Sequence, residues 1–150
     1  MIPLMEAYFD RYLELHRQIN QTVQGLSVEA LDWVPGPEMN SLNVLVTHLT
    51  GAERYWIGDV VMGDDSHRDR ESEFHVHGLS AGDLVGRLEA MDSYCQSALK
   101  TLQPTDLEAV RLSSRDGSQY TVVWALLHAL EHSAIHLGHI QMVSQMWKQR

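Results

Sequence analysis

Basic residues are scarce in this sequence. The 150 residues include 11 Lys and Arg against 20 Asp and Glu, which gives a formal net charge of −9 at pH 7. No cluster of Lys and Arg stands out that could follow a phosphate backbone. Binding to nucleic acid or to an anionic membrane surface depends on such a cluster. We therefore expect neither a nucleic-acid partner nor a membrane partner.

Cysteine is almost absent as well. Cys95 is the only one, which excludes an intrachain disulfide framework and a zinc site built from several thiolates. Cys95 also falls in an apolar helical stripe, so we expect it to be a buried and unreactive thiol. Any metal that this chain binds must be held by nitrogen and oxygen atoms.

Long apolar runs are missing too. No stretch approaches the roughly 20 apolar residues of a membrane span, and residues 1–6 lack the basic and apolar regions of a signal peptide. These absences predict a cytoplasmic protein. Residues 1–150 are expected to form one domain, which at this length buries roughly 70% of the surface that the unfolded chain exposes.

Helical periodicity, in contrast, runs through most of the chain. Apolar residues recur at three- and four-residue steps in four long stretches, which predicts four amphipathic helices. These stretches span about residues 4–26, 42–62, 80–102 and 123–140, and no proline occurs from Thr121 to Arg150. Ser27, Ser41 and Ser80 are expected to cap the helical segments that follow them, the first of which is a short turn over residues 27–33.

The remaining segments are predicted to be connections. Residues 64–78 are charged, aperiodic and poor in apolar side chains, which indicates a long exposed loop. Residues 107–123 hold two short apolar pieces around a turn-like segment, which predicts two extended pieces or a hairpin. The whole pattern fits an all-α four-helix bundle with one long connection and a possible short hairpin before the last helix.

Histidines are concentrated in the last predicted helix. His128, His132, His136 and His139 are four of the nine in the chain, and at about 100° per residue all four share one stripe of the helix. Two histidines at positions i and i+4 can bind one metal ion. His48, beside the apolar stripe of the second helix, could supply a third nitrogen to the His132 and His136 pair.

A rival motif overlaps this pair. The stretch His128-Ala-Leu-Glu131-His132 matches the inverted zincin pattern H-x-x-E-H, which would make His128 and His132 ligands and Glu131 the general base of a peptidase. Peptide hydrolysis needs a cleft for an extended substrate, and a compact bundle offers no obvious one. We rank this interpretation below the His132 and His136 pair.

Other conspicuous side chains favour structural roles. Four further histidines lie in stretches that are expected to be solvated, without a partner at ligand spacing: His16, His67, His75 and His77. Glu53 and Arg54 are also expected to be solvated. Trp56 and Trp124 sit at helical spacing and are expected to fill the core.

Three motifs together resemble the DinB-like (DinB/YfiT) superfamily, in particular its DUF664-type branch. They are Trp33-Val-Pro35-Gly-Pro37 with Asn40-Ser41-Leu42, Leu45-Val-Thr-His48-Leu49 with Glu53-Arg-Tyr-Trp56, and Leu127-His128-Ala-Leu-Glu131-His132 with His136-Leu-Gly138-His139-Ile140. The resemblance spans nearly the whole chain and implies a four-helix bundle, usually a homodimer, with His48, His132 and His136 as metal ligands. Where relatives often have Gly-Gln, this chain has Gly138-His139, which leaves open whether His139 touches the metal, its surroundings or a ligand.

The resemblance also implies a choice of activities. Some relatives resemble thiol-dependent S-transferases or isomerases, in which a metal activates the thiol of mycothiol, bacillithiol or glutathione, and others resemble metal-dependent hydrolases. We favour thiol transfer to a small electrophile, with zinc or nickel as the metal and with Glu131 and His139 as supporting or acid/base candidates. The alternatives are hydrolysis of a small substrate and a metal-binding or ligand-binding module without turnover.

Overall fold

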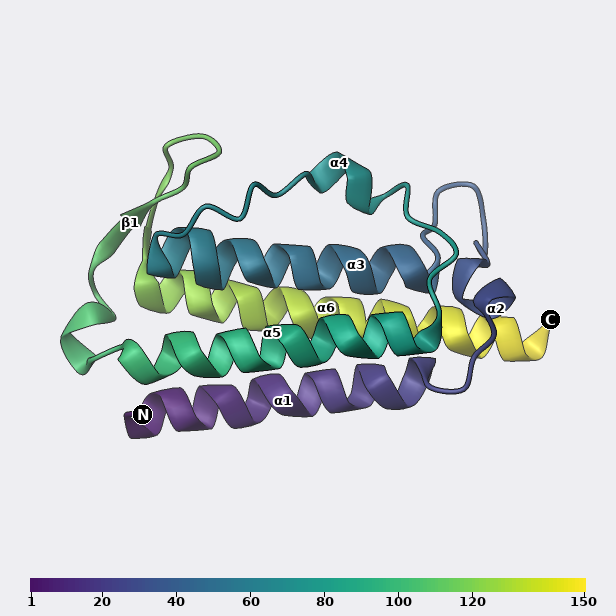
Figure 1. Cartoon of the computed structure of the whole chain (residues 1–150), viewed down its shortest axis with the longest axis horizontal. Coiled ribbons are helices and arrows are strands. Elements are labelled where there is room, and N and C mark those ends of the chain that lie inside the picture. Colours follow the sequence, from purple (N-terminus) through teal and green to yellow (C-terminus); the bar gives the residue numbers. More distant parts are fainter.

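Four long helices pack side by side along one axis (Figure 1). In the computed structural model, which describes residues 1–150, they are α1 (Pro3–Val23), α3 (Leu42–Glu53), α5 (Ala81–Thr101) and α6 (Val122–Gln149). Both α1 and α3 pack against α5 and α6, so α1 and α3 face each other diagonally across the bundle. None of these helices is long and apolar enough to cross a membrane. The predicted four-helix bundle is confirmed.

The helices begin where the sequence predicts. The hydroxyls of Ser27, Ser41 and Ser80 each accept a hydrogen bond from the backbone N–H three residues later, which satisfies a donor that the first helical turn leaves free. Ser27 opens the short α2 (Val28–Asp32), and Thr121 caps α6 in the same way.

The α3 helix continues with a wider winding. Its hydrogen bonds change to the π form over η1 (Arg54–Met62), and the helix ends at Gly63, where a φ of 76° suits glycine. A side chain at Gly58 would collide with the guanidinium of Arg54, so this glycine lets the arginine lie across the helix surface. The helix predicted over residues 42–62 is therefore confirmed in extent, with a different winding in its second half.

The connection from η1 to α5 runs back along the bundle. Because α3 and α5 point in the same direction, the chain must return along their length before α5 begins (Figure 1). On the way it forms the short α4 (Arg70–Glu73). Three histidines of this connection are exposed, as predicted: His67, His75 and His77.

Glu73 departs from the prediction of an exposed loop. Its side chain is buried, with only 6% of the residue exposed, because Arg68 and His48 bind its carboxylate. Burial of a charge is tolerated when hydrogen bonds and an opposite charge replace its hydration. The middle of the connection is thus fixed onto α3.

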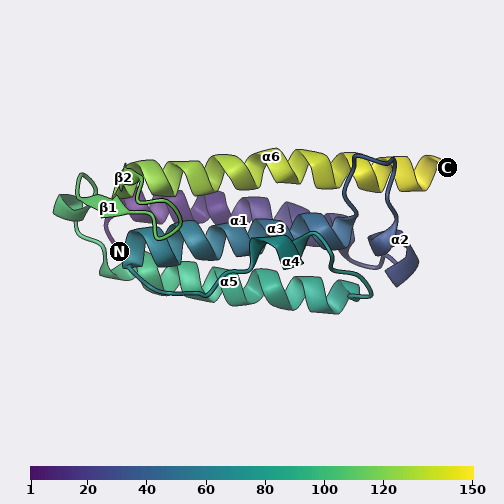
Figure 2. The same cartoon turned by 90° about the horizontal axis from the view of Figure 1, so that it is seen from above.

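A short hairpin precedes the last helix, at one end of the bundle (Figure 2). After a turn of 3-10 helix, η2 (Pro104–Asp106), strand β1 (Val110–Leu112) pairs antiparallel with β2 (Gln119–Thr121). Of the two alternatives predicted for this segment, the hairpin is confirmed. It leads directly into the cap of α6.

A buried polar layer divides the apolar core into two clusters. The carboxylate of Glu53 is its centre, since it accepts hydrogen bonds from the hydroxyls of Tyr12 at 2.8 Å and Ser133 at 2.6 Å. His16 bridges two carboxylates, with Nε2 at 2.9 Å from Glu53 and Nδ1 at 2.6 Å from Asp92. Side chains from α1, α3, α5 and α6 all meet in this layer.

The predictions of solvated His16 and Glu53 are therefore wrong, since 2% and 0% of these residues are exposed. Burial alone would lower the pKa of His16, but Glu53 and Asp92 outweigh it and raise the pKa to about 10. The imidazolium therefore stays charged at neutral pH. Arg54 is half-buried rather than solvated, because it pairs with Asp64 at 2.9 Å.

The two tryptophans expected in the core differ. Trp56 is partly buried against the core, as predicted, whereas Trp124 is 44% exposed, so its predicted core position is wrong. Trp124 instead stacks between other aromatic rings, those of Tyr120 and His128. Cys95 is buried as predicted, and burial raises the pKa of its thiol well above the ordinary value.

Candidate metal centre

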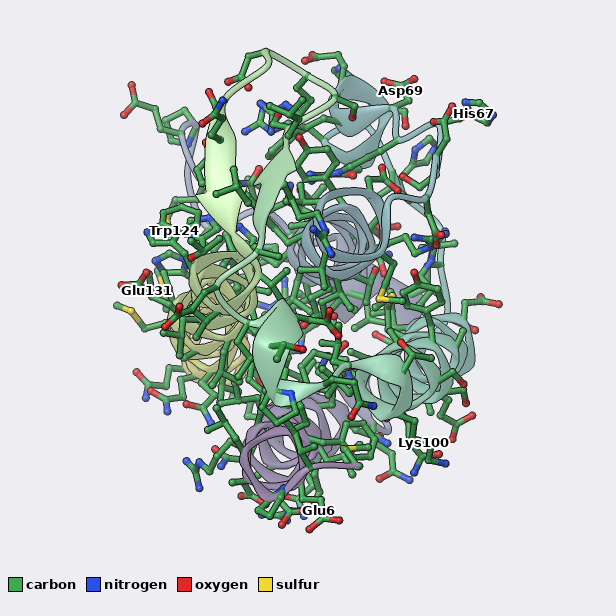
Figure 3. The ribbon with its side chains drawn as sticks, turned by 90° about the vertical axis from the view of Figure 1, so that its left-hand side faces the viewer. Glu6, His67, Asp69, Lys100, Trp124 and Glu131 are labelled. Atoms are coloured by element: carbon green, nitrogen blue, oxygen red, sulfur yellow. The ribbon has the colours of Figure 1, made fainter.

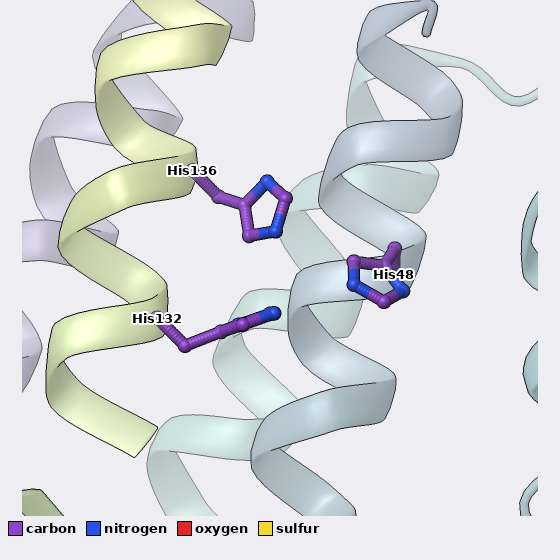
Figure 4. A group of neighbouring side chains, drawn as sticks. All are labelled: His48, His132 and His136. Atoms are coloured by element: carbon purple, nitrogen blue, oxygen red, sulfur yellow. The ribbon is translucent and has the colours of Figure 1, made fainter. Parts of the chain in front are cut away.

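Three imidazoles from two helices meet near the middle of the bundle. His132 and His136 project from α6 toward His48 on α3 (Figure 4). One nitrogen of each ring lies within 4.8 Å of the other two, and the ring centroids are 4.4 to 5.2 Å apart. The structure thus brings together the three residues that the sequence predicts as ligands.

Rigid helices set the positions of these rings. His132 and His136 are four residues apart on α6, which places both imidazoles on the side that faces α3. Between them, Ser133 donates a hydrogen bond to Glu53 of α3. The site therefore depends on helix packing rather than on loop conformation, which favours a fixed geometry.

The long connection supplies a residue that the sequence analysis missed. Nδ1 of His48 lies 2.8 Å from Oε2 of Glu73, and Arg68 donates to both oxygens of the same carboxylate at 2.6 and 2.8 Å. Glu73 sits in a charged segment without periodicity, so no sequence signal separates it from its neighbours. Only the return of the chain over α3 brings it to His48.

Glu73 fixes the orientation of His48. Burial by itself would raise the pKa of Glu73, but the hydrogen bonds from Arg68 and His48 outweigh burial and lower it. An ionised carboxylate can only accept, so Nδ1 of His48 donates and its Nε2 stays free for a metal. Phe74 packs against the same ring, with centroids 4.9 Å apart.

The two histidines of α6 are held in the neutral form. Burial, followed by the neighbouring histidines, lowers the pKa of His132 to about 3 and that of His136 to about 4. Nδ1 of each ring is buried without a hydrogen-bond partner. Neutral imidazoles are the form that binds metals, and three of them leave at least one coordination position open. The donor set therefore fits a divalent transition-metal ion.

The structure does not bring Glu131 or His128 into this cluster. Glu131 is exposed on the outer side of α6 (Figure 3). The ring of His128 stacks on Trp124 and touches Trp56, and its centroid lies 6.3 Å from that of His132. In the H-x-x-E-H interpretation, the glutamate would thus point away from the three imidazoles.

His139 lies beside the cluster, at the edge of a cavity. Its ring centroid is 5.4 Å from that of His136, and its side chain is exposed. The cavity has a volume of about 210 Å³ and is formed by the 38–40 loop, α3 and α6. Its lining includes Glu38, Asn40, Leu45, His139, Met142 and Val143.

Comparison with known proteins gives one family and several related folds. A family model described as mycothiol-S-transferase matches residues 5–147, and no curated protein matches the chain. A conserved protein from Enterococcus faecalis has a TM-score of 0.83 at 14% identity, with 100% of both chains covered.

Two further solved structures, both from Bacillus subtilis, are also similar. YfiT, described as a probable metal-dependent hydrolase with an unusual four-helix bundle topology, has a TM-score of 0.77 at 14% identity over 97% of this chain and 88% of that one. A DinB-like protein has a TM-score of 0.71 at 17% identity over 93% and 90%. At these identities the three structures establish a DinB/YfiT-like fold and nothing further.

Proposed function

Since the chain belongs to the mycothiol-S-transferase family, we propose that it joins mycothiol, through its thiol sulfur, to a small electrophile with the help of a divalent metal ion. His48, His132 and His136 would hold the ion. The observation that carries this proposal is the convergence of three imidazole nitrogens within 4.8 Å of one another.

The residues around the site prepare it for a metal and a thiol. A divalent ion bound there would supply positive charge that favours the thiolate form of an incoming thiol at neutral pH. Glu73 holds the Nδ1 proton of His48, and burial keeps His132 and His136 neutral, so all three rings can bind at once. Cys95 is buried with a raised pKa, so the reacting sulfur comes from a cofactor.

The proposed reaction is a nucleophilic substitution. The thiol loses its proton, the sulfur forms a bond to the electrophilic carbon with its electron pair, and the leaving group departs with the pair of the bond that breaks. His139, exposed beside His136, is our candidate to take up the thiol proton or to contact the ligand. Glu131 receives no role, because its side chain faces away from the cluster.

Several finer features extend the proposal. Zinc and nickel suit a site of three imidazoles, and bacillithiol and glutathione are the alternative thiols.

We also propose that residues 1–150 act as one domain of the DUF664-type branch and that the chain forms a homodimer. An exposed apolar stripe on α6 supports the homodimer, since Leu127, Ile135 and Met142 are all more than half exposed.

Elemental analysis of protein purified without an affinity tag tests the metal site. We expect near-stoichiometric metal in the parent and none in the triple alanine variant at His48, His132 and His136. His128→Ala serves as the matched control on the same helix and should keep its metal. Loss of metal in this control, with retention in His132→Ala, would instead support the H-x-x-E-H pair.

Thiol binding to the cobalt-substituted protein tests the transferase chemistry. A thiolate bound directly to cobalt gives a strong charge-transfer absorption band, which we expect on addition of mycothiol. Absence of the band with mycothiol, bacillithiol and glutathione alike would contradict thiol transfer. Hydrolysis of a small substrate, or metal binding without turnover, would then explain the site better.

A further inference from the structure

The cavity beside His139 adjoins the three imidazoles along the axis of the bundle. Leu45 precedes His48 by three residues on α3, and His139 follows His136 by three residues on α6. The two helices run antiparallel (Figure 1), so both steps lead in the same direction, by about 4.5 Å along each axis. The cavity therefore begins about one helical turn from the metal cluster.

We propose that this cavity binds part of the hydroxyl-bearing body of the cofactor thiol, with the sulfur directed to the metal cluster. The inference rests on the proposed thiol transfer and adds a location and a chemical class to it. Mycothiol carries its cysteine on a sugar and cyclitol body, so one molecule has a sulfur to place at the metal and hydroxyl groups to place elsewhere.

The lining of the cavity suits a hydroxylated ring. Glu38 offers a carboxylate, Asn40 an amide and His139 an imidazole, which together can accept hydrogen bonds from hydroxyl groups and donate to them. Leu45 and Val143 contribute apolar surface for the carbon faces of a ring. Binding sites for small molecules commonly combine a few convergent polar groups with apolar walls.

The size of the cavity limits what it can hold. Its volume of about 210 Å³ is below the roughly 300–1,000 Å³ of pockets that enclose a drug-sized ligand. This is room for one ring with its hydroxyl groups and too little for the whole cofactor. The rest of the molecule would extend along the surface toward the cluster or into solvent.

The opposite side of the cluster is less suited to this role. The hollow there is lined by Trp124, Leu127, His128, Leu130, Glu131 and Ala134, which all belong to α6. A surface formed by one helix cannot enclose a ligand, whereas three separate elements surround the cavity at His139. The polar body of the thiol therefore belongs on the His139 side.

Two thiols that share the N-acetylcysteinyl group, one with and one without the sugar and cyclitol, test this inference on the cobalt-loaded full-length protein. The charge-transfer band gives a dissociation constant for mycothiol and for N-acetylcysteine, which lacks the sugar and cyclitol. In Asn40→Ala and in Asn40→Leu we expect mycothiol binding to weaken by roughly tenfold, the effect of losing one or two good hydrogen bonds. N-acetylcysteine binding should change by less than about twofold, within the scatter of neutral substitutions.

Gln145→Ala is the matched control, an exposed polar residue of α6 outside the cavity, and it should bind both thiols like the parent. Equal loss of both thiols in the cavity variants, or no loss of either, would overturn the inference while leaving thiol transfer intact. Selective loss of mycothiol in Trp124→Ala would also overturn it, because the body would then lie on the aromatic side. A parent protein without any band would contradict the proposed function itself.

Discussion

Among single residues, Glu73 connects the long loop to the candidate metal centre through its hydrogen bond to His48. A carboxylate in this position fixes the tautomer of a ligating histidine and strengthens it as a donor. The same oxygens bind Arg68, so one side chain neutralises a buried guanidinium and orients a ligand. The orientation of His48 therefore depends on a segment outside the four long helices.

Replacement of this carboxylate is expected to weaken metal binding. In Glu73→Gln we expect the dissociation constant for zinc, measured by competition with a chromophoric chelator, to rise about 10- to 100-fold. Glu71→Gln is the matched control, because Glu71 lies on the same short helix with 81% of its side chain exposed. Equal affinities in the two variants would show that Glu73 does not orient His48.

The raised pKa of His16 predicts a pH dependence of stability. A histidine with a folded pKa of about 10, above its ordinary 6.5, contributes stability that is fully present below about pH 6.5 and is lost as the pH rises toward about 10. Asp92→Asn removes one of the two carboxylates that raise this pKa. We expect it to lower the free energy of unfolding by about 1 kcal/mol below pH 6.5, with the difference from the parent shrinking toward pH 10.

Urea unfolding across this pH range measures the effect. Glu89→Gln, an exposed carboxylate one turn from Asp92 on α5, controls for the change in net charge. A difference between parent and Asp92→Asn that stays constant with pH would contradict the assigned charge state of His16.

At the scale of elements, helix α6 is held to the rest of the bundle by Ser133 as well as by apolar packing. The hydroxyl of Ser133 donates to the buried carboxylate of Glu53 at 2.6 Å. Hydrogen bonds to charged groups contribute more than neutral ones, and an unmade bond to a buried charge is costly. One hydroxyl thus connects the helix that carries His132 and His136 to the helix that carries His48.

Two serines of α6 make a matched pair for testing this contact. Ser133→Ala is expected to lower the free energy of unfolding by about 1.5–3 kcal/mol. Ser144→Ala should change it little, because the Ser144 hydroxyl is buried without a hydrogen-bond partner. Urea denaturation of both variants compares them, and equal losses would mean that the Glu53 contact adds nothing beyond packing.

The helices could be predicted from the sequence, whereas several buried polar contacts between them could not. The caps at Ser27, Ser41 and Ser80 and the helix extents follow from local spacing, so they could be predicted. The convergence of His48 with His132 and His136 could also be predicted. It follows from the i,i+4 spacing of the pair, from the position of His48 beside the apolar stripe of another bundle helix, and from the family resemblance. His16, Glu53 and Glu73 could not be placed, because polar residue types usually lie at the surface and their partners are brought near only by the packed bundle.

For the whole molecule, the candidate metal centre links α3 to α6, so metal binding there should stabilise the entire bundle. A ligand that binds only the folded state adds about 2.7 kcal/mol when its free concentration is 100 times its dissociation constant. In a chain of this size that corresponds to a rise in Tm of about 5–10 °C. Differential scanning calorimetry with zinc, and again after chelation, should record this rise and its reversal.

The triple alanine variant at His48, His132 and His136 is the control for this experiment. Its Tm should be indifferent to zinc and to the chelator. A similar rise in the variant would mean that zinc stabilises the bundle through other groups, such as the exposed acidic side chains that outnumber the basic ones.

The polar layer also fixes the register of the helices along the bundle axis. Apolar side chains above and below the layer can pack against different apolar partners, whereas the buried Glu53 carboxylate needs hydrogen-bond donors. A slip of α6 by one turn, about 5.4 Å, would set Glu53 opposite Ala129 or Leu137 and deprive this buried charge of its hydrogen bond from Ser133. The same slip would move either His132 or His136 away from His48, because the two are about one turn apart. The buried Glu53 carboxylate therefore selects the register in which His132 and His136 face His48.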